Sequence, residues 1–213
     1  GMLVWQDMVN GGSAYKHWFV TYLATLMNWN HISFSDDEKH AGLLSRLHPE
    51  GKDEFRLEIT ETIAFLYNHP SIVVWVPFNE GWGQFDALKA TEFIRKRDNT
   101  RPIDHASGWY DQGGGDIKSI HWYFRPYRHH QRKGEQRAVC LTEYGGYNCA
   151  VPGHCWGDKA EFGYKKISDP AEFNRAFERL MTEQILPAKQ QGLAAAVYTQ
   201  VSDVESERNG LLT

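Results

Sequence analysis

The sequence predicts an α/β protein with a (β/α)8 TIM-barrel-like arrangement of parallel strands. Apolar runs of strand length alternate with stretches of helical periodicity along the 213 residues, which is typical of a parallel sheet covered by helices. An open, doubly wound sheet is the alternative, but no glycine-rich phosphate loop joins an early strand to a helix. Polar residues follow the ends of most strands instead, and in a barrel those ends meet at one mouth.

The first elements follow from the spacing of apolar residues. An apolar run at 2–8 ends in polar residues, as a buried strand does, and helical spacing predicts a helix over 15–29. The polar stretch 30–53 indicates a long loop with some helix. The next predicted helix, 54–70, is stopped by Pro70. Its apolar face consists of Phe55, Ile59, Ile63 and Leu66.

The rest of the chain continues the alternation. Strands are expected at 71–78, 101–107, 117–124, 137–147 and 193–203, and helices at 85–98 and 169–191. The last helix has Asp169 at its N-cap and Pro170 at its first position, and Gly192 ends it. No repeat of fixed period and no low-complexity linker interrupts the chain, so a single domain over 1–213 is expected.

Composition excludes several classes of partner. The net charge of −4 gives no electrostatic reason to bind nucleic acid or an anionic membrane, and no apolar stretch approaches the roughly 18 residues that span a bilayer. The basic segment 125–134 is expected to be a solvated loop. Cys149, His154 and Cys155 are close in sequence, but one cluster without a second pair indicates a loop, so neither a metal nor another cofactor is expected.

Two glutamates end apolar strands. Glu80 follows "VVWVPFN" and Glu143 follows "AVCLT". A single charged residue at such a position usually pairs with a basic side chain or caps a helix, because an uncompensated charge there is costly. Two of them, on different strands and both beside glycines and aromatic residues, favour a site. Paired carboxylates at a barrel mouth can cleave a glycosidic bond, since one donates a proton to the leaving oxygen and the other attacks the anomeric carbon.

These motifs carry a family resemblance. "NHPSIVVWVPFNEGWGQFD" at 68–86, with "AVCLTEYGGY" at 138–147, resembles the catalytic barrel of glycoside hydrolase family 2. That family includes β-galactosidases, β-mannosidases and β-glucuronidases. The stretch 3–8 resembles its third barrel strand and 195–213 its eighth-strand region. The chain therefore matches barrel strands three to eight.

The resemblance implies roles for individual residues. Glu80 is expected to be the general acid/base and Glu143 the nucleophile of a retaining β-galactosidase-type exo-glycosidase, with carboxyl groups roughly 5 to 5.5 Å apart. Asn79 is expected to hydrogen-bond the sugar 2-hydroxyl, and Tyr123 to donate to Glu143. The full set of expected substrate-binding residues is Asn79, Tyr123, Trp82, His121, Asp7 and Trp109.

The sequence also departs from the family pattern. No segment corresponds to the first two barrel strands or to the β-sandwich domains that precede the family's barrel, so an incomplete barrel is expected. Open edges of apolar strands pair readily with another chain, and we expect self-association through them. We also expect poor catalysis by the isolated chain, because missing strand ends would leave the sugar badly positioned.

Alternatives remain at this point. A truncated barrel of this kind could bind carbohydrate without cleaving it, and turnover of an aryl glycoside separates that reading from a glycosidase. A barrel enzyme with Asp7, His105 and His121 as metal ligands is disfavoured, because no single element carries ligand spacing. The sugar stays open among β-galactoside, β-mannoside and β-glucuronide. The basic segment, which borders the predicted site, is suited to recognising a uronate or sulfated sugar through arginine.

Overall fold

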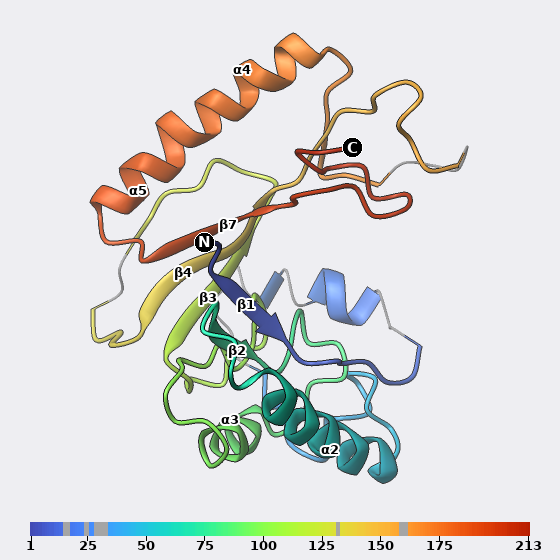
Figure 1. Cartoon of the computed structure of the whole chain (residues 1–213), viewed down its shortest axis with the longest axis vertical. Helices are drawn as coiled ribbons and strands as arrows, with labels where there is room; N and C mark the ends of the chain where they lie inside the picture. Colours follow the sequence, from blue (N-terminus) through green and yellow to red (C-terminus); the bar gives the residue numbers. More distant parts are fainter. Residues whose placement is uncertain (15–17, 24–25, 28–33, 131–132, 158–161) are drawn as a thin grey trace. The chain divides into compact units, whose positions relative to one another are not determined.

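The computed structural model describes residues 1–14, 18–23, 26–27, 34–130, 133–157 and 162–213. The chain divides into two compact units, Gly1–Ser119 and Ile120–Thr213 (Figure 1). The division does not test whether the chain folds as one domain, so the single-domain expectation stays a prediction. No helix among the described residues has the length and apolar character needed to cross a membrane.

The first unit is built on a parallel pair of strands. β1 (Val4–Asp7) pairs with β2 (Ile72–Val76), both close to their expected positions. The strand expected at 101–107 is wrong as a continuous element, because the chain there forms only two isolated parallel bridges to the β2 segment. Proline explains the interruption: Pro77 and Pro102 have no N–H to contribute to a ladder.

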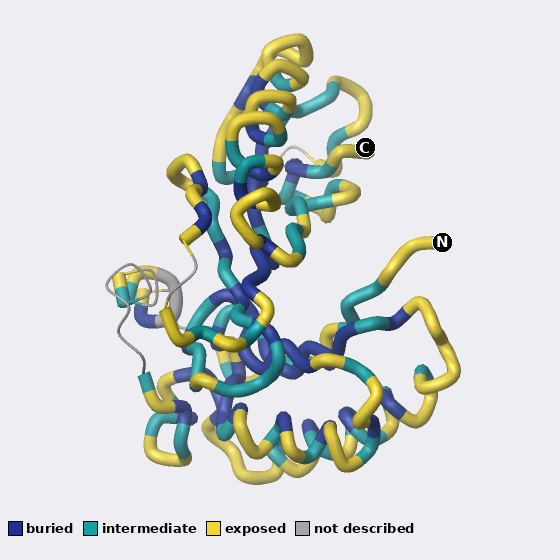
Figure 2. Tube along the Cα trace, turned by 90° about the vertical axis from the view of Figure 1, so that its left-hand side faces the viewer, coloured by how far each residue is buried: buried dark blue, intermediate teal, exposed yellow. Residues whose placement is uncertain are grey.

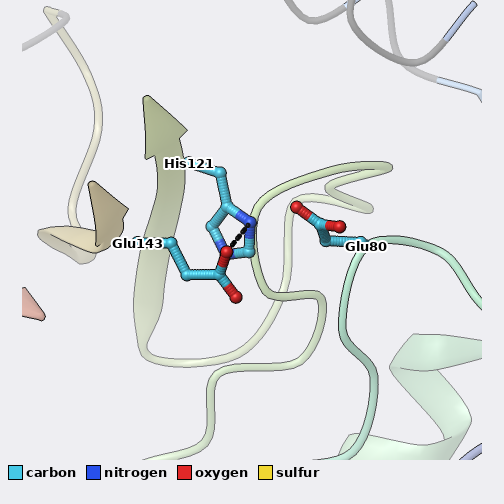
Figure 3. Close-up of side chains that lie close together, drawn as sticks. All are labelled: Glu80, His121 and Glu143. Carbon is cyan, nitrogen blue, oxygen red and sulfur yellow. Dashed lines mark ion pairs between the residues drawn. The ribbon is translucent and has the colours of Figure 1, made fainter. Parts of the chain in front are cut away.

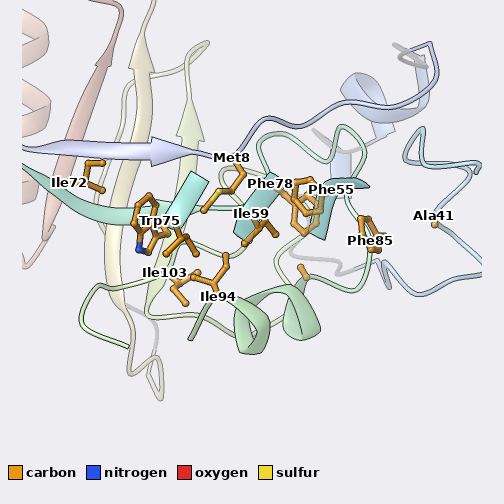
Figure 4. Close-up of a cluster of buried hydrophobic side chains, with 12 residues drawn as sticks. Met8, Ala41, Phe55, Ile59, Ile72, Trp75, Phe78, Phe85, Ile94 and Ile103 are labelled. Carbon is orange, nitrogen blue, oxygen red and sulfur yellow. The ribbon is translucent and has the colours of Figure 1, made fainter. Parts of the chain in front are cut away.

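Helices cover this pair and close an apolar core. α2 (Pro49–Leu66) begins five residues before the predicted start, and α3 (Ala87–Arg95) lies inside its predicted range. Only part of the helix expected over 15–29 is described, as the short helix η1 (Trp18–Leu23); its other positions lie largely outside the described residues. Figure 4 shows the core between β2 and α2. Its members other than alanine are Met8, Phe55, Ile59, Ile63, Ile72, Trp75, Phe78, Phe85, Ile94 and Ile103.

The buried carboxylate of Asp98 stabilises the β2 segment. Asp98 accepts hydrogen bonds from the indole N–H of Trp75 (2.8 Å), from the backbone N–H of Thr100 (2.8 Å) and from the guanidinium of Arg101. Arg101 also donates to the carbonyl of Ile72 at 2.8 Å. Burial alone would raise the pKa of Asp98, but the Thr100 hydroxyl, which donates to it at 2.6 Å, and these other donors outweigh burial and hold the pKa at about 2.

The second unit contains a three-stranded sheet in the order β3-β4-β7. β3 (Ile117–Trp122) crosses the boundary between the units, and β4 (Ala138–Gly145) pairs in parallel with β7 (Ala195–Thr199). All three lie within their predicted ranges. Two short strands, β5 (Tyr147–Asn148) and β6 (Lys165–Lys166), pair separately.

The predicted C-terminal helix packs on this sheet as three successive segments. These are α4 (Pro170–Leu180), η2 (Met181–Ile185) and α5 (Leu186–Gln190). Asp169 caps the helix as expected, since its carboxylate accepts from the backbone N–H groups of Ala171 and Glu172. The outward face is exposed, and the inward face is buried with the sheet (Figure 2). The inward residues are Ala176, Leu180, Ile185 and Ala188.

Replacing Asp98 by Asn should weaken the first unit. We expect the free energy of unfolding at pH 7 to fall by about 3 kcal/mol, because the Arg101 guanidinium loses its buried counter-charge. Urea unfolding measures the difference. The matched control is Asp53→Asn, whose ion pair with Arg56 is solvent-exposed and should cost below about 1 kcal/mol.

The same carboxylate predicts a pH dependence. Its folded-state pKa of about 2 lies below the ordinary value of 3.8, so its stabilisation is present above pH 4 and is lost as the pH falls towards 2. The wild type should lose about 2 kcal/mol over that range from this group alone. An equal acid-induced loss in Asp98→Asn would contradict the assignment.

Candidate active site

The second unit brings three polar side chains together around one carboxylate. Glu143 lies in β4 near its C-terminal end, with its side chain 26% exposed. The phenol of Tyr123, the residue after β3, donates a hydrogen bond to Glu143 Oε2. The Tyr123 oxygen also lies 3.0 Å from the hydroxyl of Thr199, at the end of β7. The side chains at the ends of all three strands of this sheet therefore converge.

Alternation along β3 directs two side chains towards Glu143. His121 and Tyr123 are two residues apart, so they point to the same side of the extended backbone, whereas Trp122 points the other way and packs against the core of this unit. The imidazole of His121 is buried, and its Nδ1 lies 3.3 Å from Glu143 Oε2 (Figure 3). Two side chains from one strand thus contact the same carboxylate oxygen.

A β-bulge occurs where β4 carries the glutamate. Leu141 is paired with Ala196 and Tyr144 with Tyr198, so β4 has one more residue than β7 between these pairs. The extra length falls at Thr142 and Glu143. Bulges re-aim side chains and are frequent beside functional sites. The bulge gives a local reason for the Glu143 side chain to leave the regular alternation of the strand.

Burial fixes the protonation state of Tyr123. Removal from water raises the pKa of its phenol far above the ordinary value of 10.0, and the negative charge of Glu143 raises it further. The phenol therefore stays protonated and acts as a donor. A hydrogen bond donated to a carboxylate favours the ionised carboxylate. The arrangement is suited to holding Glu143 as an oriented anion.

Glu80 belongs to the first unit, just beyond β2. Its backbone has φ +51°, and its N–H donates to the carbonyl of Ser107 at 3.0 Å. The next residue, Gly81, has φ +73°, and a Cβ there would lie 2.3 Å from the ring of Tyr110. Glycine is required at this turn on both counts. The expected separation of the Glu80 and Glu143 carboxyl groups, which lie in different units, stays a prediction.

The other expected residues of the first unit have varied surroundings. Asn79 forms a parallel bridge with Ser107, and Trp82 is 44% exposed. Asp7 lies exposed at the end of β1, while Trp109 packs partly buried in a small aromatic cluster. Their expected contacts with a sugar stay predictions.

The metal-site alternative receives no support from His105. Its imidazole is buried, and its Nε2 accepts the backbone N–H of Gln112 at 3.0 Å. The same nitrogen lies 3.2 Å from a carboxylate oxygen of Asp111, so it faces groups of the protein. Two residues near Glu143 were not among those expected from the sequence. Thr199, which contacts Tyr123, lies within the strand expected at 193–203, and Tyr164, whose ring stacks on that of Tyr123, lies outside every predicted element.

The comparisons with known proteins agree with the barrel prediction. The family model "Glycosyl hydrolases family 2, TIM barrel domain" matches residues 45–166. A β-glucuronidase from Faecalibacterium prausnitzii is similar over 99% of this chain and 45% of its own, at 15% identity and a TM-score of 0.50. A GH2 β-galacturonidase from Eisenbergiella tayi, bound to galacturonate, is similar over 77% of this chain and 31% of its own, at 16% identity and a TM-score of 0.50.

These solved structures bear on the fold alone. They confirm a (β/α)8 barrel-like fold, of which the described strands form part. The chain spans less than half the length of either one. No curated protein sequence matches the chain.

Substituting Gly81 by Ala should destabilise the turn that carries Glu80. We expect a loss of about 2 to 4 kcal/mol, from the positive φ together with the clash against the Tyr110 ring. Gly113→Ala is a matched control, because Gly113 has φ +76° but nothing within 4 Å of the added Cβ. Chemical denaturation should show a cost near 1 kcal/mol for the control. Equal losses in the two variants would show that the Tyr110 contact is unimportant.

Proposed function

Since this chain belongs to family 2 of the glycosyl hydrolases, we propose that it is the catalytic part of a retaining exo-β-glycosidase. The observation that carries the proposal is the hydrogen bond from Tyr123 to Glu143, which is suited to keeping a nucleophilic carboxylate ionised and aimed. A carbohydrate with a terminal β-linked sugar is the proposed substrate.

The proposed reaction proceeds in two displacements. The Glu143 carboxylate attacks the anomeric carbon while Glu80, as the acid, protonates the leaving oxygen. A covalent glycosyl-enzyme forms, and the alcohol departs. Glu80 then accepts a proton from water as the water attacks the anomeric carbon and releases Glu143. Asn79 is proposed to hydrogen-bond the sugar 2-hydroxyl, a contact that strengthens in the transition state.

Two substitutions test the assignment of roles in a complete enzyme that carries this sequence. Glu143→Ala should reduce turnover of a nitrophenyl β-glycoside to background, and added azide should restore it with an α-glycosyl azide as product, because azide fits the space of the lost nucleophile. Glu80→Ala should spare the first step on substrates with good leaving groups, since these need little protonation. Azide rescue of Glu80→Ala that gives the α-product would mean that the roles are reversed.

The non-catalytic alternative has its own outcome in this experiment. A protein that only binds carbohydrate would show no turnover that depends on Glu143, although it would retain a sugar ligand in equilibrium binding. Turnover by the wild type that is lost in Glu143→Ala excludes it.

The terminal sugar is proposed to be a β-galactoside, as the sequence resemblance suggests. A uronide is the second candidate, supported by the basic segment that follows β3 in the unit containing Glu143 and by the uronide substrates named for the two solved structures. A panel of nitrophenyl β-galactoside, β-mannoside, β-glucuronide and β-galacturonide decides between them. We expect the galactoside to have the largest kcat/KM, and a larger value for either uronide would replace that proposal.

A further inference from the structure

One aromatic contact beside Glu143 has no part in the mechanism proposed above. The ring of Tyr164 lies face to face with that of Tyr123, with ring centroids 3.5 Å apart and planes inclined by 2°. Tyr164 comes from the segment that follows β5, well outside β3 and β4. Its ring covers one face of the phenol that donates to the carboxylate.

The backbone on both sides of Tyr164 is fixed by hydrogen bonds. The Tyr164 N–H donates to the carbonyl of Gly146 at 3.1 Å, and β6, which begins at the next residue, pairs with β5. On the other side, the Phe162 N–H donates to Ser206 at 2.9 Å, and the Phe162 carbonyl accepts from Arg208 at 3.3 Å. The position of Tyr164 is therefore set by its backbone.

Gly146 permits this close approach. It has φ +60°, and a Cβ at this position would lie 2.3 Å from the Tyr164 ring. A larger residue would push the ring away from Tyr123. Gly146 therefore allows both the turn after β4 and the close packing of the Tyr164 ring.

Other rings hold Tyr164 at its edges. Phe124 and Phe162 meet it edge to face, at centroid distances of 5.6 and 5.3 Å. Both of these phenylalanines are largely exposed. Both phenylalanines approach Tyr164 in edge-to-face geometry, whereas Tyr123 stacks in parallel on its ring.

We propose that Tyr164 is a positioning residue, which holds the Tyr123 ring in the orientation from which its hydroxyl reaches Glu143. A swing of the Tyr123 side chain about χ1 would carry the hydroxyl away from Glu143, and the single hydrogen bond at the tip of the ring is all that the carboxylate offers against it. A flat ring stacked on Tyr123 restricts that swing. The inference rests on the proposed function, because its kinetic consequence is better alignment of the nucleophile.

A double-mutant cycle tests the inference, using the best nitrophenyl glycoside of the panel. Tyr123→Phe should lower kcat about 10- to 1000-fold, the range expected for one charge-stabilising donor. Tyr164→Leu should lower kcat roughly 10- to 100-fold with little change in KM, since misplacement by about 1 Å costs up to about 100-fold. In the Tyr123→Phe background, Tyr164→Leu should cost no more than about twofold, because its effect is transmitted through the lost hydroxyl.

Three further variants guard against a purely structural effect. Tyr164→Phe should retain wild-type kcat, because it keeps the flat ring, and Lys166→Ala in β6 is the control for changes in the same segment. Tyr164→Met replaces Tyr164→Leu if the leucine variant does not fold. Equal losses from Tyr164→Leu in both backgrounds, or a fall in thermal stability without a fall in kcat, would overturn the proposal.

Crystal structures of the wild type and Tyr164→Leu give a readout that needs no activity. The Tyr123 hydroxyl should bond Glu143 in the wild type and leave hydrogen-bonding distance in the variant. If it stays in place, the inference is wrong whatever the kinetics. If the wild type has no turnover but the hydroxyl moves in the variant, the proposed function fails and the positioning role stands.

Discussion

The organisation of the second unit depends on compensating one half-buried carboxylate. Glu143 projects from an apolar strand, where a charge without partners would be unfavourable. Its neighbouring strand β3 leads to a hydrogen-bond donor, the phenol of Tyr123, and places the imidazole of His121 3.3 Å from the same carboxylate oxygen. The same contacts that make the charge tolerable also define its direction. In this unit, the same side chains meet the requirement for stability and, in the proposed mechanism, the requirement for a directed nucleophile.

The two strand-end glutamates are held in different ways. Glu143 sits at a bulge in a paired strand, so its orientation depends on side-chain partners. Glu80 sits in a left-handed backbone conformation fixed by Ser107 and by the adjacent Gly81. A general acid/base has to exchange protons during the proposed reaction. A nucleophile has to remain ionised, which calls for a donor such as Tyr123.

The sequence could predict whatever depends on local pattern. Apolar runs located β2 and β4, and strand-end position singled out Glu143. The family resemblance implied that Tyr123 donates to Glu143, and the structure contains that hydrogen bond. The strand expected at 101–107 is wrong as a continuous element. The alternation of elements along the chain predicts a strand there, but Pro102 has no N–H to donate to the ladder. Tyr164 could not be found, since its position depends on pairing between β5 and β6, two-residue strands with no periodic signal.

Two glycines, Gly81 and Gly146, occur where a strand-end turn meets an aromatic ring from elsewhere in the chain. Gly81 and Gly146 each follow a segment that carries one of the two glutamates, and each has an aromatic ring in the space a side chain would occupy. The rings are Tyr110 in the first unit and Tyr164 in the second. A sharp turn alone would explain the positive φ at both positions, but it would not require the ring contact. The same combination therefore occurs twice. In each case the glycine leaves room for an aromatic side chain from a distant segment, and that ring limits the space near the residue that carries the carboxylate.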